Sequence, residues 1–290
     1  MEMQKARSFA LIGYPLGHTM SPPIHAALFA LAGQTGDYQV MEIPPEALSG
    51  RVGALRALTG FNVTIPHKLE IIPHLDALSD SARRFGAVNT VRCGEQMVGY
   101  NTDVDGFLRS LREAGVETRD QRVLILGAGG AGRMMAIELA LRGCDVVLAV
   151  RLGGVPRAEG VLADIRALSP HARARLVLMD EVLPLMEREG AFDLMCNATP
   201  VGMFPKVEAM PATEEMMAGC RQVFDAIYNP GETRLLACAR RLSKKAVGGM
   251  SMLVWQAVAA HEIWDGSSYD PADIAALTVR FEREMAKTGR

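Results

Sequence analysis

The pattern of apolar and small residues is most regular near the middle of the chain. Four apolar residues at positions 123–126 lead directly into residues 127–132, whose glycines have the spacing G-x-G-x-x-G. Apolar residues at helical spacing follow over 134–141, and a second apolar run occupies 145–150. This order predicts a buried strand, a tight turn, a helix and a second parallel strand.

The spacing of these glycines is typical of a loop that binds pyrophosphate. Gly127 would permit the turn, Gly129 would let the backbone approach the phosphates, and Gly132 would let the helix pack closely on the strand. The positive end of the helix would then face the phosphate oxygens. The candidate cofactor-binding residues are therefore Gly127, Ala128, Gly129, Gly130, Ala131 and Gly132. A glycine-rich loop in another kind of α/β protein stays open as the alternative.

Strand-like and helical patterns also alternate on either side of this loop. Apolar runs at 8–13, 38–43 and 60–66, and a hairpin pattern within 85–100, predict an α/β domain over residues 1–104. Residues 105–248 are predicted to form a Rossmann-type domain with a doubly wound parallel sheet. Residues 249–290 are mainly helical in pattern, and we expect them to return and pack on the first domain.

Composition narrows the class of protein. A chain of 290 residues favours two domains. The net charge of −2 argues against nucleic acid or an anionic membrane as the main partner, and no apolar run reaches the roughly 18 residues of a membrane span. The first residues carry an acid and lead into a strand-like run, which is unlike a signal peptide. We therefore expect a cytoplasmic protein.

The cysteines and histidines do not have the spacing of a metal site. The five cysteines are scattered, odd in number and never in a C-x-x-C pair, which is typical of reduced thiols: Cys93, Cys144, Cys196, Cys220 and Cys238. Neither His18 nor His67 has a second ligand at a suitable spacing. We therefore predict no bound metal.

Two residues are candidates for proton transfer, which an enzyme that oxidises an alcohol requires. Lys68 follows a strand, a proline and a histidine, and Asp103 lies in the polar segment 101–103 between the two predicted domains. A partly desolvated lysine beside a carboxylate could exchange protons. From spacing alone, a surface role for Lys68 and a helix-capping role for Asp103 stay open.

Seven segments in order, together with the glycine-rich loop, resemble the shikimate dehydrogenase family over nearly the whole chain. They match the family's substrate-carboxylate loop, its lysine-bearing turn, two polar substrate-binding segments, two later loops and the segment that returns to the first domain. In the order of the chain they are residues 18–22, 62–68, 86–90, 101–103, 197–203, 225–230 and 249–257.

The resemblance implies a role for each matching residue. Lys68 and Asp103 would be the catalytic pair, and Thr19 and Ser21 would bind the substrate carboxylate. The remaining substrate-binding residues would be Asn62, Thr64, Asn89, Tyr228 and Gln256, whose side chains can pair with ring hydroxyls or with the carboxylate. The cofactor would also contact Asn197, Thr199 and Gly249. Two of these residues have simpler interpretations, because Ser21 could cap a helix and Thr64 could be an ordinary strand residue.

The end of the second strand in the Rossmann-type domain bears on the choice between NADP and NAD. An acid there would bind the ribose 2′-hydroxyl, whereas an arginine would accept a 2′-phosphate. Arg151 stands at this position, in the predicted polar loop 151–157, and the first acid is Glu159. NADP is therefore expected, with NAD possible, because the neighbours Val150 and Leu152 are apolar where NADP-using members carry polar residues. A solvated loop position for Arg151 stays open.

The resemblance implies reversible, NADP-dependent hydride transfer between shikimate and 3-dehydroshikimate, a step toward chorismate and the aromatic amino acids. The active site is expected in the cleft between the domains. Thr19 stands where many members have serine, and Trp255 beside Gln256 is bulky, so the preferred ring acid stays open. Three alternatives to this function remain. They are a quinate/shikimate dehydrogenase, an aminoshikimate-type paralogue using NAD or another ring acid, and a catalytically idle nucleotide-binding regulatory protein. We expect a small-molecule substrate, no nucleic acid or membrane partner, and a monomer or homodimer.

Overall fold

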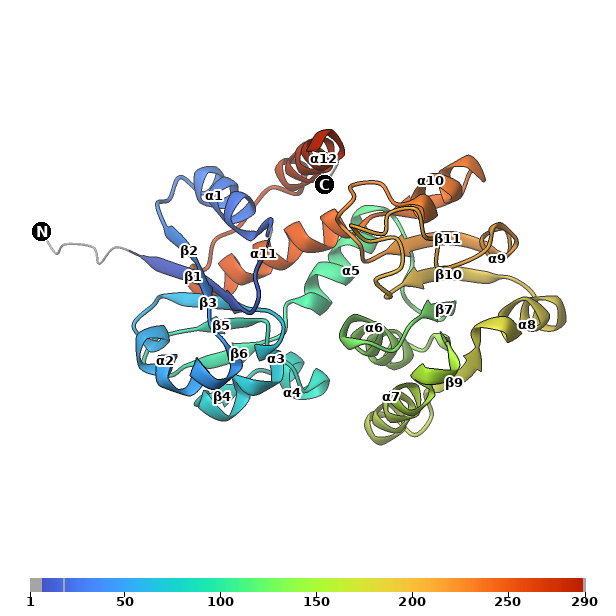
Figure 1. Ribbon diagram of the computed structural model, residues 1–290, viewed down its shortest axis with the longest axis horizontal. Coiled ribbons are helices and arrows are strands. Elements are labelled where there is room, and N and C mark those ends of the chain that lie inside the picture. The colour runs from blue at the N-terminus through green and yellow to red at the C-terminus, as the bar shows by residue number, and fades with distance from the viewer. Residues whose placement is uncertain (1–6, 18, 289–290) are drawn as a thin grey trace, which may run out of the picture. The chain divides into compact units, whose positions relative to one another are not determined.

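The computed structural model describes residues 7–17 and 19–288 (Figure 1). The chain divides into two compact units. The first contains the segment up to Gly106 together with Val254–Leu277, and the second contains Phe107–Leu253 together with the segment from Thr278 onward. The first boundary lies two residues after the predicted one. The C-terminal segment is shared between the units, because helix α12 (Pro271–Thr288) passes from the first into the second.

A six-stranded mixed sheet forms the centre of the first unit. Its order is β2-β1-β3-β5-β6-β4. Strand β1 pairs in parallel with β2 and β3, whereas β5 is antiparallel to both β3 and β6. The strands are β1 (Ser8–Gly13), β2 (Asp37–Glu42), β3 (Gly60–Val63), β4 (Ala77–Leu78), β5 (Thr90–Arg92) and β6 (Val98–Tyr100).

Alternating side chains of this sheet enter two apolar clusters. Ala10 and Ile12 pack in one cluster with Leu48 and Leu55 of α2, whereas Phe9 packs on the other face with Trp264 of α11. This is the period of two that a strand imposes on its side chains. The helices are α1 (Ser21–Leu31), α2 (Leu48–Arg56), α3 (His67–Glu70), α4 (Asp80–Phe85) and α11 (Gly249–Asp265), with 3₁₀ turns at Pro45–Ala47 and Ile72–His74.

The sheet of the second unit is entirely parallel, in the order β12-β11-β10-β7-β8-β9. The order reverses between β10 and β7, as in a doubly wound sheet. This confirms the predicted α/β class with a Rossmann-type domain. The strands are β7 (Arg122–Leu126), β8 (Asp145–Val150), β9 (Arg173–Leu178), β10 (Phe192–Asn197), β11 (Cys220–Asp225) and β12 (Lys245–Val247).

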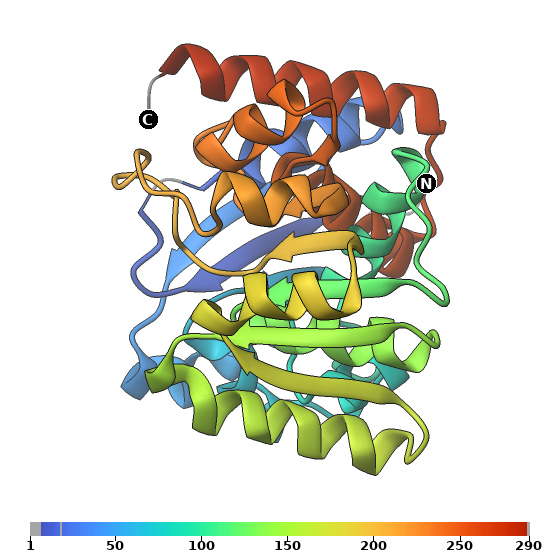
Figure 2. The ribbon, with the colours of Figure 1, turned by 90° about the vertical axis from the view of Figure 1, so that its right-hand side faces the viewer.

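Helices cover both faces of this parallel sheet. Figure 2 shows α8, α9 and α10 in front of the strands, and their apolar residues Leu185, Met217 and Leu235 share one buried cluster with Leu124 of β7. Helices α6 and α7 lie on the other side in Figure 1. The helices are α5 (Asp103–Glu113), α6 (Gly130–Leu141), α7 (Val155–Leu168), α8 (Val182–Glu189), α9 (Glu214–Ala218) and α10 (Arg234–Arg241), with 3₁₀ turns at Leu152–Gly154 and Met179–Glu181.

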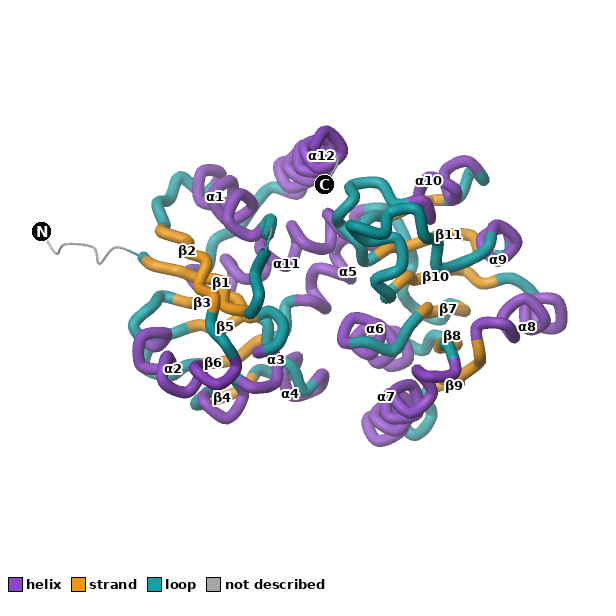
Figure 3. Tube along the Cα trace, in the orientation of Figure 1, coloured by secondary structure: helices purple, strands orange, loops and turns teal. Residues whose placement is uncertain are grey.

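One local prediction in this unit is wrong. The segment 151–157 is not a loop throughout, because a 3₁₀ turn occupies Leu152–Gly154 and α7 already begins at Val155. Pro156 stands in the first turn of α7, where a missing N–H costs nothing and the fixed φ suits a helix. The longer connections, drawn in teal in Figure 3, include the segment between β10 and α9. None of the described helices is both long and apolar enough for a bilayer span.

Candidate active site

Lys68 and Asp103 form an ion pair in the first unit. The ammonium nitrogen Nζ of Lys68 donates to Oδ2 of Asp103 at 2.6 Å. The two side chains are 27% and 18% exposed, so the pair is partly desolvated but still reachable by a small molecule. Their separation in sequence is 35 residues, and the sheet brings them together. The arrangement has the two groups that the sequence suggested for proton transfer.

Lys68 owes its position to its buried neighbour His67. Nε2 of His67 lies 2.6 Å from the carbonyl oxygen of Ile43, which can only accept, so Nε2 carries the proton and donates. The backbone N–H of His67 also donates to the Thr64 carbonyl, and the Lys68 carbonyl accepts from Val88 at 2.8 Å. These bonds fix the short helix α3 at the end of β3. The spacing of residues in the sequence bears only on whether His67 could bind a metal. It does not predict that His67 positions Lys68.

Asp103 is held from its own segment and from the segment that leads into β5. The Asn101 side-chain oxygen accepts from the backbone N–H of Asp103 at 3.2 Å, which fixes the first turn of α5. The Asn89 amide donates to Oδ1 of Asp103 at 2.9 Å, while Lys68 takes Oδ2. Both carboxylate oxygens therefore have a donor, and the orientation of the carboxylate is set before any ligand arrives.

A polar network extends from Asp103 toward β2. The amide of Asn62 donates to Thr90 Oγ1 at 3.1 Å, and the hydroxyls of Thr90 and Thr102 lie 3.1 Å apart. Tyr38 donates its phenolic hydrogen to Oδ1 of Asn62 at 2.8 Å. Burial raises the pKa of the Tyr38 phenol, so it stays protonated and remains a donor. Tyr38 lies in none of the matched segments, and Thr90 lies in the segment 86–90 without a predicted role of its own. Only the pairing of strands shows that both side chains belong to the network around Asn62.

Two buried histidines continue this network behind Asn62. His25 Nδ1 lies 3.0 Å from His261 Nε2, and the Tyr269 hydroxyl lies 2.8 Å from His261 Nδ1. The His25 ring stacks on Tyr38 with centroids 4.1 Å apart. Burial lowers the pKa of both histidines, to about 4 for His261, so both rings are neutral near pH 7.

The other predicted substrate-binding residues differ in whether their side chains already form hydrogen bonds within the protein. Thr19 Oγ1 donates to Ser21 Oγ at 3.3 Å and accepts from the Ser21 N–H. Ser21 is the first residue of α1 and does not cap it; the capping position is Met20, without a side-chain bond. Within the described chain the Thr64 hydroxyl and the Gln256 amide form no hydrogen bond, so both remain free to bind a ligand.

Tyr228 belongs to the second unit, and burial raises the pKa of its phenol. Its role in substrate binding stays a prediction, as do the roles of Thr19, Ser21, Thr64 and Gln256. His18 lies outside the described residues. Within the residues that the structure describes, no group of three or more metal-binding side chains is assembled.

The glycine turn of the second unit has the geometry that its spacing predicts. Gly127 has φ +95°, a conformation that other residues rarely adopt. A Cβ on Gly132 would lie 2.1 Å from the Gly127 carbonyl oxygen, so only glycine lets α6 approach the turn. A Cβ on Gly129 or Gly130 would meet no protein atom within 4 Å. Protein packing therefore does not require glycine at those two positions, which is consistent with close approach of a ligand.

The N-terminus of α6 is suited to an anion. Gly129 is its N-cap and, having no side chain, makes no side-chain capping hydrogen bond to the first N–H groups of the helix. Ala128 precedes the cap and Ala131 lies in the first turn. Arg151 follows β8, is exposed, and has no ion-pair partner among the described residues. The residues present thus fit a dinucleotide with an additional phosphate on its ribose.

The three remaining cofactor candidates have internal structural roles. Oδ1 of the buried Asn197 accepts from the N–H and the hydroxyl of Thr199, at 3.0 and 2.7 Å, and its amide donates to Asp225. The Thr199 hydroxyl also accepts from Val201. A Cβ on Gly249 would lie 2.4 Å from the Ala226 carbonyl oxygen, so packing alone requires glycine there. Direct contacts of these residues with a cofactor stay predictions.

Comparison with known proteins places these features in one family. The shikimate dehydrogenase substrate binding domain matches residues 11–91. Shikimate dehydrogenase (NADP(+)) of Moorella thermoacetica is 42% identical over 264 residues, which are 89% of this chain and 87% of that protein. The structure of shikimate 5-dehydrogenase from Thermus thermophilus, in complex with NADP(H) and shikimate, is 34% identical with a TM-score of 0.81 and covers 95% of this chain and 99% of its own. The Listeria monocytogenes enzyme, in complex with shikimate and NAD, is 31% identical with a TM-score of 0.85, covering 94% and 96%.

Proposed function

The chain belongs to the shikimate dehydrogenase family, and from that membership we propose that it catalyses reversible, NADP-dependent hydride transfer between shikimate and 3-dehydroshikimate. The observation that carries the proposal is the ion pair of Lys68 with Asp103, whose second oxygen is held by Asn89. A protein that only binds a nucleotide has no need of such a pair in its other unit. The reaction requires both units, because the ion pair belongs to the first and the glycine turn to the second.

In this proposal Lys68 and Asp103 manage the proton of the reacting hydroxyl. During reduction of the ketone, the Lys68 ammonium donates a proton to the carbonyl oxygen as negative charge develops there. During oxidation, the pair accepts the proton of the hydroxyl. Asp103 keeps the ammonium oriented, and Asn89 keeps Asp103 from rotating. The nicotinamide, when bound, accepts or supplies the hydride.

Residues around the pair would recognise the substrate. Thr19 and Ser21 would hold its carboxylate, and Asn62, Thr64, Asn89, Tyr228 and Gln256 would pair with its hydroxyls or carboxylate. Thr64 and Gln256 support this most directly, because their side-chain polar atoms have no hydrogen-bond partner among the described residues. A site built from such groups rejects analogues that lack a hydroxyl, since its own polar atoms are left unpaired.

The cofactor would be held by the turn 127–132 and the N-terminus of α6, with Asn197, Thr199 and Gly249 as further candidates. Arg151 would pair with the 2′-phosphate of NADP, since a guanidinium forms charge-assisted bonds with phosphate oxygens. The named relatives support NADP. A solved relative binds NAD, so we propose NADP as the preferred cofactor and NAD as a poorer one.

The proposal is tested by following reduced nicotinamide absorbance with shikimate and quinate, each against NADP and NAD. We expect the highest kcat/KM with shikimate and NADP. A higher value with quinate or with NAD would move the assignment to a relative with another preference. Lys68→Ala should lower kcat by about 10²–10⁴ while NADP still binds. Unchanged turnover in this variant, or cofactor binding by the wild type without turnover of any ring acid, would overturn the proposal.

We also propose that the enzyme acts in the cytoplasm, in the synthesis of aromatic amino acids, as a monomer or homodimer. The state of the cysteines supports a reducing compartment, because all five are free: Cys93, Cys144, Cys196, Cys220 and Cys238. Sedimentation of the purified protein would decide between the two oligomeric states.

A further inference from the structure

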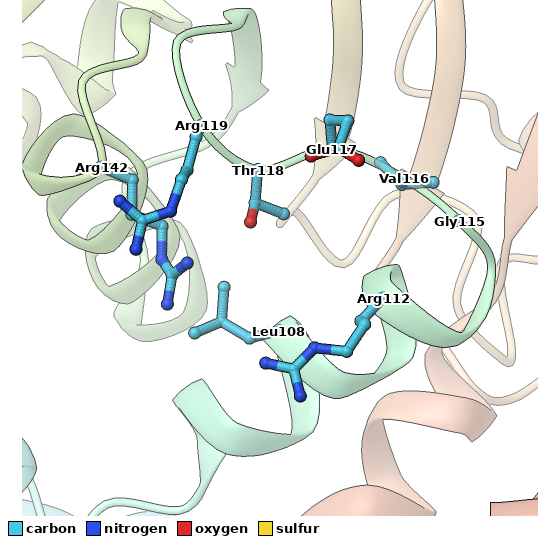
Figure 4. A pocket seen from close by; sticks show the side chains of 8 residues that line it. All are labelled: Leu108, Arg112, Gly115, Val116, Glu117, Thr118, Arg119 and Arg142. Atoms are coloured by element: carbon cyan, nitrogen blue, oxygen red, sulfur yellow. The ribbon is translucent and has the colours of Figure 1, made fainter.

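A basic hollow of about 340 Å³ lies in the second unit, where α5 and α6 end and the chain leads into β7. Figure 4 shows Arg119 and Arg142 on one side and Arg112 on the other, with Leu108 and Thr118 between them. The hollow is also lined by Gly115, Val116 and Glu117. Among the eight lining residues, three cations thus accompany one carboxylate.

The cations in this hollow are only partly neutralised by the protein. Arg142 pairs with Glu138, where Nε and Oε1 are 2.7 Å apart. Arg112 and Arg119 are exposed, and neither has an ion pair within the described part of the chain. The eight lining residues together with Glu138 carry three guanidinium groups and two carboxylates, and Asp120, whose N–H bonds the Arg142 carbonyl, lies outside the lining. Like charges gathered around one hollow repel each other unless an anion lies among them.

The ends of helices explain only part of this cluster. Arg112 lies in the last turn of α5 and Arg142 is the C-cap of α6, where the negative end of the helix dipole favours a cation. Arg119 lies in the segment between α5 and β7 and serves no helix end. Helix dipoles therefore do not account for Arg119, and guanidinium groups bind carboxylates and phosphates in a forked geometry.

We propose that this hollow is a binding site for a small organic anion with two or more acidic groups, either carboxylate or phosphate. Arg112, Arg119 and Arg142 would bind the acidic groups. Leu108 and Val116 would contact the carbon skeleton, and Thr118 would supply a hydroxyl. The volume is at the lower end of the range of about 300–1,000 Å³ that small-molecule sites occupy, which suits a compact metabolite.

The proposed site is separate from the cofactor-binding turn. Its lining includes Arg119, in the segment that leads into β7 at Arg122, whereas the glycine turn follows the end of the same strand at Leu126. A five-residue strand separates the two positions, since successive residues of a strand advance by about 3.3 Å. The phosphates of a dinucleotide at the glycine turn therefore do not account for these arginines.

The test is calorimetric titration of the full-length protein with citrate, 3-phosphoglycerate and inorganic phosphate, in the presence of saturating NADP. We expect saturable 1:1 binding of citrate or 3-phosphoglycerate with a Kd of about 1 mM or tighter, and weaker binding of inorganic phosphate. Binding of citrate alone would identify a carboxylate site, and binding of 3-phosphoglycerate alone a phosphate site. Absence of saturable binding by both organic anions would overturn the proposal.

Variants assign the binding to the hollow. Arg112→Ala and Arg119→Ala should each weaken it at least tenfold with only a small change in Tm, because both side chains are exposed and unpaired in the described chain. Arg166→Ala is the matched control, since Arg166 is also exposed and lies in the last turn of α7. Equal affinities for all three variants and the wild type would show that the anion binds elsewhere, and would also overturn the proposal.

Discussion

The amide of Asn89 donates to Oδ1 of Asp103 at 2.9 Å, on the carboxylate oxygen opposite the one that binds Lys68. Asn89 is 5% exposed and its own oxygen accepts from the Thr102 N–H at 2.7 Å. The position of the amide is therefore fixed by the backbone of the segment that carries Asp103. A side chain anchored in this way sets the direction of the carboxylate, and through it the direction of the Lys68 ammonium.

Replacing Asn89 should therefore impair activity more than stability. In Asn89→Ala, Asp103 loses a donor and the buried N–H of Thr102 loses its acceptor. The second loss costs about 1–3 kcal/mol of unfolding free energy. We expect kcat to fall by about 10–100-fold in addition, because the reacting groups are no longer held in position. Urea denaturation and steady-state kinetics measure the two effects separately.

The matched control is Asn101→Ala. Asn101 is also buried, but among the described residues its side chain bonds only to backbone groups of Ala87 and Asp103. We expect a similar loss of stability with a smaller loss of kcat. If kcat falls by the same factor in both variants when their losses of stability are equal, Asn89 supports the fold and has no separate role in orienting Asp103.

The two kinds of glycine in the turn should respond differently to an added methyl group. Gly132→Ala places a Cβ 2.1 Å from a backbone oxygen, so the turn must shift and Tm should fall together with the affinity for NADP. Gly129→Ala meets no protein atom within 4 Å and has an ordinary φ of −72°, so Tm should change little. Its KM for NADP should nevertheless rise, because the methyl group occupies the space that the phosphates would use. Unchanged KM in Gly129→Ala would contradict the assigned position of the pyrophosphate.

Arg151 should distinguish the two cofactors. If its guanidinium pairs with the 2′-phosphate, Arg151→Ala loses a charge-assisted bond of about 1.5–3 kcal/mol, which corresponds to a roughly 10–100-fold rise in KM for NADP. KM for NAD should remain unchanged, because NAD has no phosphate at that position. Arg166→Ala, at the far end of the following helix, controls for the loss of a surface charge. Equal changes for both cofactors would show that Arg151 does not recognise the 2′-phosphate.

The sequence predicted elements well where local pattern and local geometry coincide. In the turn 127–132, glycine is required by backbone conformation and by contacts with residues nearby in the sequence. The segments that contain Lys68 and Asp103 carry recognisable motifs. Arg151 was also located correctly at the end of β8, although α7 begins earlier than its polar residues suggested. Propensity alone does not show that Val155 and Pro156 begin a helix.

The supporting residues were harder to predict because they depend on long-range pairing. Tyr38 reaches Asn62 only because β2 and β3 both flank β1. The sequence around His67 does not predict its hydrogen-bond partner. Its hydrogen bond with the Ile43 carbonyl depends on the fold. Asn197 and Thr199 belonged to a segment expected to face the cofactor, yet their hydroxyl and amide groups largely bind each other and Asp225. The spacing of residues does not show whether such a polar segment binds a cofactor or forms hydrogen bonds within the protein.

The histidine pair behind Asn62 predicts a specific dependence of stability on pH. One arrangement of protons gives each hydrogen bond among Tyr269, His261 and His25 a donor and an acceptor. Tyr269 donates to Nδ1 of His261, and Nε2–H of His261 donates to Nδ1 of His25. The remaining N–H of His25 then donates to the side chain of Asn62. This hydrogen bond raises the pKa of His25, but burial lowers that pKa by more. This direction requires both rings to be neutral.

Well above pH 6.5 these histidines are neutral in both the folded and the unfolded chain, so they add no pH dependence there. As the pH falls from 6.5 toward 4, the unfolded chain takes up protons that the folded chain excludes, and the unfolding free energy decreases. For His261, the difference between the ordinary value of 6.5 and a pKa of about 4 corresponds to about 3 kcal/mol at most. The nearby Asp265 raises the pKa of His261, whereas Arg7 lowers it, so neither reverses the direction set by burial.

Chemical denaturation at a series of pH values between 7.5 and 4 measures this loss. His261→Gln retains hydrogen-bonding groups but cannot titrate, so we expect a lower stability at pH 7.5 and a shallower decline below pH 6.5. His171→Gln is the control, because His171 is exposed and should leave the slope as it is in the wild type. A slope in His261→Gln as steep as that of the wild type would place the acid sensitivity in other groups. Because Asn62 shares the network with His25, KM for the ring acid should also rise in His261→Gln, whereas His171→Gln should leave it unaltered.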